Sequence, residues 1–213
     1  MYTCLMQDSV LTVTPTSRYG KSFDTVRVET YFQLENQLPE SEEFLVPSLK
    51  KIPEQDLQIF KAGKVQFAPM PKSVVAQEVQ DYVLQVTTGN VEGVRSDALL
   101  GLSAMYMDAV KLEEITTGVY HLNYSYSIYP DEVDGYYYIH QLLPFKGFDM
   151  PRGTVRLTAV LPAGAVCDRD GTTGKDISGT VVSEEDAQTF ANGLTVVSFL
   201  YQQDPEFIIK YRY

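Results

Sequence analysis

The sequence predicts a mainly β protein: an antiparallel β-sandwich with a few short α-helices. Apolar and polar residues alternate along several segments, and clusters of turn residues separate those segments. The composition also favours strands, with 15 Tyr and 10 Phe but no Trp. A chain of 213 residues fits one medium domain or two small ones, and no obvious linker divides it. We therefore expect a single β-rich domain over residues 1–213, with residues 35–110 as a candidate inserted arm that carries helical segments.

The clearest alternation lies in residues 118–143. Every second residue from Tyr120 to Ile128 is apolar or aromatic, which is the period of a strand with one buried face. Turn-forming residues follow at positions 130–135, and aromatic residues resume at Tyr136. The simplest interpretation is a long β-hairpin with a polar tip.

The same period of two predicts the remaining strands. In residues 26–34, for example, Val26, Val28 and Phe32 share one face. The other strands are expected at residues 9–14, 154–161, 194–201 and 206–213.

Short helices are predicted where a capping residue or a proline precedes helix-forming residues. Pro53 suits the first position of a helix, and Ser96 or Asp97 can cap another. The predicted helices cover residues 53–61, 73–81, 98–107 and 183–190, and the second is expected to continue as a strand.

The charge of the chain bears on its partners. A formal net charge of −11 and a pI near 4.6 argue against binding to nucleic-acid phosphates, which requires a basic face. We expect no sequence-specific contact with nucleic acid. An acidic surface would still suit a protein that DNA must slide past.

The two cysteines, Cys4 and Cys167, lie far apart in the sequence. Their spacing predicts neither a zinc site nor a disulfide framework. The sequence shows no secretory signal pattern and no apolar run of about 18 residues, the minimum for a membrane-spanning helix. We therefore expect no membrane contact, and a protein that is made and used without export.

A weak metal candidate comes from the alternating aspartates Asp168 and Asp170, with Asp176 further along. Their carboxylate oxygens and the intervening glycine resemble part of a calcium loop. The fifth position is Thr172, and the twelfth, Gly179, has no side-chain oxygen. A solvated turn is therefore the favoured interpretation, and no metal or cofactor is expected.

Three patterns in part resemble catalytic sites, and none is complete. The sequence around Ser103 begins like a nucleophile elbow but lacks the second glycine. A hairpin turn centred on Val133 would pair His121 with Phe145 and His140 with Tyr126, which leaves the histidines apart. The acidic residues at the hairpin tip are interpreted as solvated turn residues: Asp131, Glu132 and Asp134. We therefore predict that the chain is not an enzyme.

Large apolar side chains in turn-rich segments predict surface that meets another chain. Two segments have this character, one within the proline-rich residues 35–53 and one in residues 144–153. The expected interface residues are Phe44, Leu45, Val46, Phe145, Phe148 and Met150.

These observations favour a structural protein of a multi-subunit assembly, with other protein subunits as its partners. A bacteriophage virion, assembled in the host cytoplasm, is the expected setting, and an auxiliary or decoration protein of the capsid is the first role considered. A tail-tube or head-to-tail connector protein is the first alternative, because an acidic lumen would keep DNA mobile. The second alternative is a non-catalytic carbohydrate-binding module that uses tyrosine rings as stacking platforms.

Overall fold

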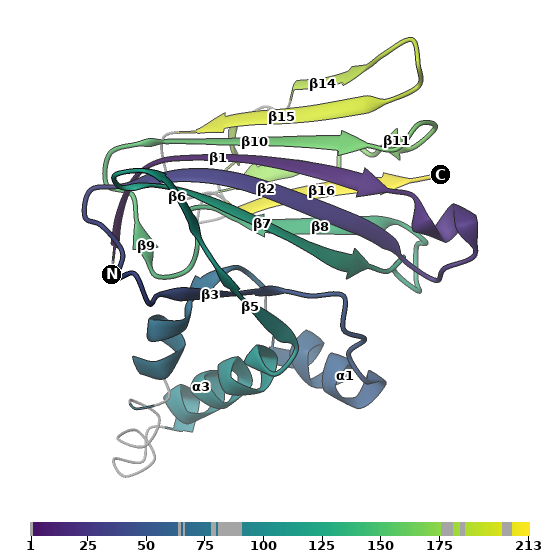
Figure 1. The fold of residues 1–213 in the computed structure, drawn as a ribbon. Helices are drawn as coiled ribbons and strands as arrows, with labels where there is room; N and C mark the ends of the chain where they lie inside the picture. The colour runs from purple at the N-terminus through teal and green to yellow at the C-terminus, as the bar shows by residue number, and fades with distance from the viewer. Residues whose placement is uncertain are drawn as a thin grey trace.

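The computed structural model describes residues 2–63, 65, 67–77, 80, 91–175, 181–183, 186–201 and 206–213. This part of the chain is mostly β, with strands in sheets of eight, five and three members. The prediction of a mainly β protein is confirmed. Figure 1 shows the two larger sheets above and the smaller sheet with its helices below.

The eight-stranded sheet contains the clearest predicted strands. Its order is β14 (Asp186–Thr189), β15 (Thr195–Tyr201), β10 (Thr154–Leu161), β1 (Tyr2–Thr14), β2 (Asp24–Leu34), β7 (Val119–Ile128) and β6 (Glu113–Thr116), with β9 (Phe148–Asp149) beside the start of β1. β1 runs parallel to both β10 and β9, so the expectation of a wholly antiparallel protein is wrong. Alternation along one strand specifies which face is buried but not the direction of its neighbour.

The five-stranded sheet is built on the C-terminal strand. Its order is β11 (Val166–Cys167), β16 (Glu206–Arg212), β12 (Thr173–Lys175) and β13 (Val181–Ser183), with β8 (Tyr137–Leu142) also paired to β16. The predicted hairpin is therefore wrong, because β7 belongs to one large sheet and β8 to the other. The turn residues between them carry the chain from sheet to sheet, and each strand finds its hydrogen-bonding partner elsewhere.

The two larger sheets share one hydrophobic core. Leu11, Val28 and Leu157 contribute to it from the eight-stranded sheet, and Ile139 and Ile209 contribute from the five-stranded sheet. All five side chains have no exposed surface. Strands of both larger sheets thus contribute to the same core cluster.

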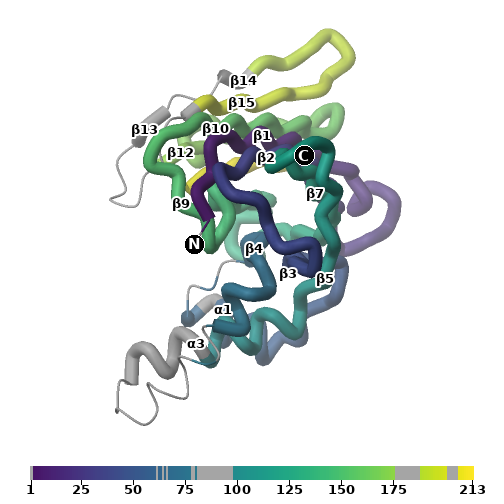
Figure 2. Tube along the Cα trace, turned by 60° about the vertical axis from the view of Figure 1, so that its left-hand side comes forward, coloured from purple at the N-terminus to yellow at the C-terminus, as the bar shows by residue number. Residues whose placement is uncertain are grey.

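Residues 35–110, the arm, contain a small sheet and most of the helical residues. The sheet has the order β4 (Met70–Pro71), β3 (Glu43–Pro47) and β5 (Met107–Lys111). The helices are α1 (Glu54–Gly63), α3 (Val91–Ala104) and a helical segment at residues 72–77; a 3-10 turn, η1 (Thr16–Tyr19), lies outside the arm. In Figures 1 and 2 the arm lies along one side of the larger sheets.

The predicted helices meet different outcomes. α1 confirms the helix at residues 53–61. α3 begins seven residues before the predicted 98–107, and it ends earlier than predicted because the chain enters β5 at Met107. The predicted helix at residues 183–190 is wrong, since β14 occupies part of it and pairs with β15. A local capping pattern was outweighed there by a sheet partner from a later segment.

Candidate binding groove

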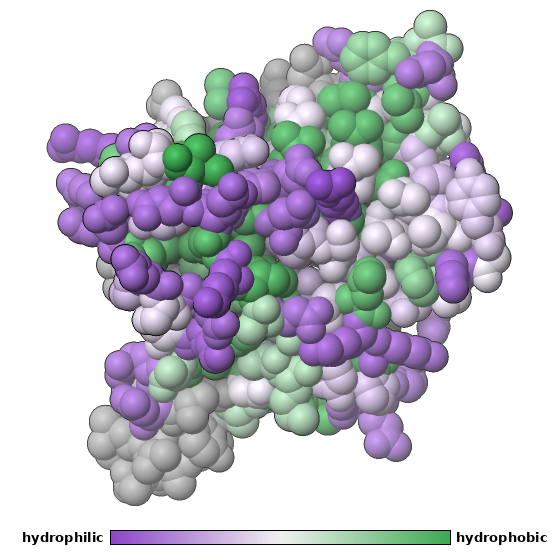
Figure 3. Space-filling model, in the orientation of Figure 1, coloured by the Kyte–Doolittle hydropathy of each residue, from purple (hydrophilic) through white to green (hydrophobic). Residues whose placement is uncertain are grey.

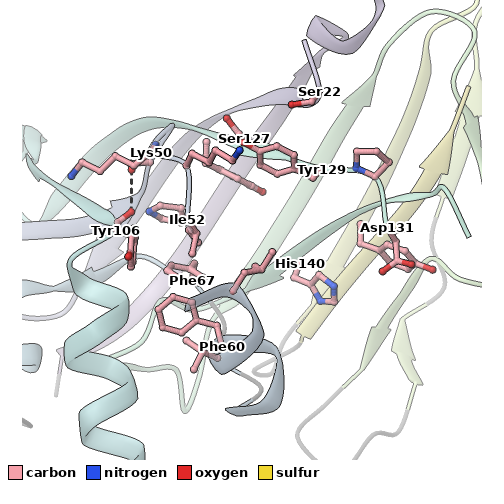
Figure 4. Close-up of a pocket in the computed structure, with 18 of the residues that line it drawn as sticks. Ser22, Lys50, Ile52, Phe60, Phe67, Tyr106, Ser127, Tyr129, Asp131 and His140 are labelled. Atoms are coloured by element: carbon pink, nitrogen blue, oxygen red, sulfur yellow. Dashed lines mark hydrogen bonds between the residues drawn. The ribbon is translucent and has the colours of Figure 1, made fainter. Parts of the chain in front are cut away.

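A groove of about 1090 Å³ opens between the arm and the larger sheets. Figure 4 shows Phe60 and Phe67 on the arm side of it, with Ser127 and His140 on the strands opposite. The lining combines aromatic and aliphatic side chains with a few polar groups. This is the usual composition of a ligand-binding pocket.

The arm wall is held by contacts within the arm. Phe60 is almost fully buried, and its ring lies edge-on to Phe67 at 5.0 Å and to Tyr106 at 5.9 Å between ring centroids. The Tyr106 hydroxyl donates a hydrogen bond to Asp56 of α1, and this bond raises the pKa of Tyr106. Lys50 forms an ion pair of 2.7 Å with Asp108. The wall is therefore fixed from both α1 and β5.

The opposite wall comes from the end of β7 and from β8. The hydroxyls of Tyr126 and Ser127 are buried and have no hydrogen-bond partner in the described part of the chain. Burial raises the pKa of Tyr126. Burial also lowers the pKa of His140, although Glu206 at 3.9 Å opposes the shift. This wall thus presents mainly aromatic rings to the groove.

In the described part of the chain, no strand forms a hydrogen-bonded pair with one side of β7 along its second half. β6 pairs with β7 only from Val119 to His121. The preceding strand, β5, does not continue this pairing and pairs instead with β3 of the arm. Among the described residues, no strand takes up the pairing position next to Asn123–Ile128. We call this position the open lane. The groove reaches it, because Tyr126 and Ser127 line both.

The backbone groups that face the open lane follow from the ladder with β2. Leu34 donates its N–H to the carbonyl of Gly118 at 2.9 Å, so even-numbered residues of β7 exchange hydrogen bonds with β2. In an antiparallel pair the intervening residues point their N–H and C=O groups the other way. Asn123, Ser125 and Ser127 therefore present these groups to the open lane.

The rim of the groove carries charges of both signs. Lys51 lies on the arm side and Glu132 on the turn after β7, and neither has an ion-pair partner in the described residues. The carboxylate of Asp131 accepts a hydrogen bond from the backbone N–H of Val133 at 2.8 Å. The arm side also carries Glu54, whose carboxylate accepts a hydrogen bond from the Gln58 amide at 2.7 Å. A bound molecule would thus meet charges of both signs on the arm side and negative groups on the turn after β7.

The predicted interface residues lie mostly inside the protein. Phe145, Phe148 and Phe44 surround the fully buried ring of Phe32, with centroid distances of 5.2–5.9 Å. Met150 and Val46 are buried in the same core, and Leu45 packs in part against a smaller arm cluster around Met70. The expectation that residues 144–153 display apolar side chains is therefore wrong, because the partners of these side chains belong to the same chain.

The weak calcium candidate already holds a cation of the protein. The Lys210 ammonium lies 3.1 Å from a carboxylate oxygen of Asp168 and 3.3 Å from Asp134, and it keeps the pKa of Asp168 below its usual value. Gly171 leaves room for this lysine, since an added Cβ would come within 2.4 Å of its Cδ. Asp170 is exposed. Asp176 lies outside the described residues, as does Gly179.

The histidines are not brought together, and their predicted partners are wrong. His121 stands on the outer face of the eight-stranded sheet, stacked on Tyr31 at 4.6 Å and 3.3 Å from Glu113. His140 pairs instead with Ile208 in the other sheet. Figure 3 shows that outer face, where hydrophilic residues are mixed with hydrophobic ones.

The other catalytic candidates have structural contacts. Ser103 is in α3, where its hydroxyl donates to the carbonyl of Leu100 at 2.8 Å. Asp134 accepts a hydrogen bond from the Tyr138 hydroxyl at 2.6 Å. No three His, Cys, Asp or Glu side chains within the described ranges are placed to bind a metal ion.

The sequence did not reveal a buried polar cluster around Asp24. This carboxylate has no exposed surface and accepts hydrogen bonds from the hydroxyls of Ser17 (2.6 Å), Tyr211 (2.8 Å) and Tyr213 (2.6 Å). Arg18 lies 3.9 Å from the centre of the Tyr213 ring. The cluster fastens the C-terminal strand to the turn between β1 and β2. Its members come from three segments, so no local pattern could predict it.

Comparison with protein-family models finds no match, and comparison with curated proteins finds no similar one. No helix in the described residues is long and apolar enough to cross a membrane.

Proposed function

We propose that this chain is a structural, non-catalytic subunit of a multi-subunit assembly, and that it binds a neighbouring subunit through the groove. The observation that carries the proposal is the open lane beside β7, next to a preformed and largely apolar groove. Unpaired strand edges are sites where another chain can add, and proteins usually cover or protect them. Here the described residues of the arm come close to the edge, and the groove lies between them and the larger sheets.

For the setting we propose a bacteriophage virion, with an auxiliary or decoration protein of the capsid as the first role. The support is the plan of the chain: a β body, which we infer to be a two-layered sandwich, carries an arm packed along one side and a net charge of −11. Residues 144–153 no longer support this proposal, since Phe145 and Phe148 are buried. The groove replaces them as the proposed contact surface.

A tail-tube or head-to-tail connector protein is the alternative within the same setting. Its support is the acidic composition, which would repel DNA in a lumen. The two roles predict different symmetry, because a decoration protein forms local clusters on a shell and a tube protein forms closed rings. Electron microscopy of the assembled chain separates them.

A carbohydrate-binding module is the second candidate. The specific observation in its favour is the wall that combines the rings of Tyr126, Tyr129 and Tyr138 with hydroxyl groups. A glycan array tests it. Binding that is lost in a Tyr138→Ala variant would support this candidate against the assembly proposal.

The test of the assembly proposal is a mass measurement in solution. The full chain is measured alone over a range of concentrations and then with the other structural proteins of the candidate particle. We expect a stable complex of defined stoichiometry in at least one mixture. A chain that stays monomeric in every mixture contradicts the proposal.

A further inference from the structure

We propose that the groove takes an extended segment of a partner subunit, which adds as a strand to β7 in the open lane. This inference rests on the proposed function and specifies how the partner is held. The lane continues the position of β6, whose own pairing stops at His121. An added strand would therefore extend the eight-stranded sheet along the remaining length of β7.

The backbone of β7 supplies the hydrogen bonds. Asn123, Ser125 and Ser127 turn their N–H and C=O groups toward the lane, as the ladder with β2 requires. Residues 123–128 span about 20 Å at about 3.3 Å per residue, which is the length of an ordinary strand. Main-chain hydrogen bonds of this kind provide affinity in strand addition.

The groove supplies the side-chain selectivity. Alternate side chains of an added strand point to opposite faces of the sheet, so one set would enter the groove between β8 and the arm. That set would meet Phe60, Phe67 and Tyr126, which favours apolar or aromatic residues at every second position. The other set would face solvent beside Asn123 and Ser125 and can be polar.

The rim charges orient the segment. Lys51 and Glu132 stand on different sides of the groove without ion-pair partners in the described residues. A segment with an acidic residue near Lys51 and a basic residue near Glu132 would satisfy both. The partner segment is therefore an extended peptide with alternating apolar residues and opposite charges toward its two ends.

The test uses the full chain and a display library of random peptides of about eight residues, a common strand length. We expect enrichment of peptides with apolar residues at alternate positions. Affinities of the enriched peptides are then measured by fluorescence anisotropy for the native chain and two variants. Ser125→Pro removes one N–H from the lane, whereas Ser125→Ala changes the side chain and keeps the N–H.

We expect Ser125→Ala to bind as the native chain does, and Ser125→Pro to bind at least about tenfold more weakly, because proline blocks a ladder hydrogen bond. The amides that pair with β2 are on even-numbered residues, so thermal unfolding should show a folded Ser125→Pro variant. If that variant does not fold, Lys51→Glu gives the answer: enriched peptides should lose their acidic residue and gain a basic one.

Three results would overturn the inference: no enriched peptide, equal binding by Ser125→Pro and Ser125→Ala, or displacement of the peptides by a glycan that binds alone with higher affinity. A failure here is distinct from failure of the assembly proposal. If the native chain and Ser125→Pro enter a complex equally well, the structural role is supported and strand addition in the open lane is wrong. If the chain binds peptides through the open lane but stays monomeric with every candidate subunit, strand addition is supported and the structural role is wrong.

Discussion

Two aromatic clusters of this protein differ in how they are closed. Phe32 lies at the centre of one, enclosed by Phe44, Tyr120, Phe145 and Phe148 from three separate segments. Phe60 lies at the centre of the other, where arm residues cover it on one side and the groove lies on the other. Similar residues thus form part of the main core in one place and one wall of the groove in the other.

The largest expected effect is at the closed cluster. Phe32→Ala should lower the free energy of unfolding by about 3–5 kcal/mol, because it removes a fully buried ring and leaves a cavity that cannot collapse. Chemical denaturation monitored by tyrosine fluorescence measures this loss. A loss below about 1 kcal/mol, typical of a surface substitution, would show that this cluster is not closed.

Asp24 joins the C-terminal strand to the start of β2. We expect Asp24→Ala to cause the next largest loss in the free energy of unfolding. Truncation leaves the hydroxyls of Tyr211 and Tyr213 without their acceptor, at a cost of about 3 kcal/mol. Asp24→Asn is the matched control, since it keeps one acceptor oxygen and should lose less. Equal losses for the two variants would contradict the assigned role of the acceptor.

At the open cluster we expect a smaller loss of stability and a larger loss of binding. Phe60→Ala should cost about 2–3 kcal/mol, at or below the low end for a buried ring, because the space it leaves adjoins the groove and can fill with solvent. Peptides selected on the native chain should bind this variant more weakly. Phe32→Ala, measured where it remains folded, is the control and should retain that affinity.

The buried tyrosines of the body predict a loss of stability in alkali. Burial, with a smaller contribution from the hydrogen bond to Asp24, raises the pKa of Tyr211 and of Tyr213. In the unfolded chain these groups ionise near pH 10, so above that pH the unfolded state loses protons that the folded state keeps. The free energy of unfolding should therefore fall as the pH rises above about 10.

Denaturation curves at stepped pH measure this slope. Tyr213→Phe has one such group fewer and should show a shallower decline. An unchanged slope in this variant would assign the alkaline loss to other groups.

The smallest expected effect concerns calcium. Lys210 lies against Asp168 and Asp134, so added calcium should not raise the unfolding temperature measurably. Magnesium at the same concentration is the control for ionic strength. A rise specific to calcium, lost in Asp168→Asn, would restore the calcium interpretation.

Sequence patterns predicted the strands better than their partners. The period of two located β2, β7, β10, β15 and β16 because it records which face of a strand is buried. It could not place β7 and β8 in different sheets, since pairing depends on segments such as β2 and β16 that are remote in the sequence. The parallel pairing of β1 with β10 escaped prediction for the same reason.

The site was less predictable than the fold. Phe145 and Phe148 follow turn residues and were expected to be exposed, yet Phe32 covers them. The groove is formed by residues near Lys50 and Tyr126 that have no common local pattern. The Asp24 cluster and the Lys210 contacts likewise arise only when distant segments pack together.

The open lane can be tested most directly by amide hydrogen exchange, resolved by residue. In the isolated chain we expect the amide of Ser125 to exchange much faster than that of His121, which faces β6 in the same strand. In complex with a partner subunit, the Ser125 amide should become as protected as that of His121. A Ser125 amide that is already protected in the isolated chain, or one that stays unprotected in a purified complex, would contradict the account.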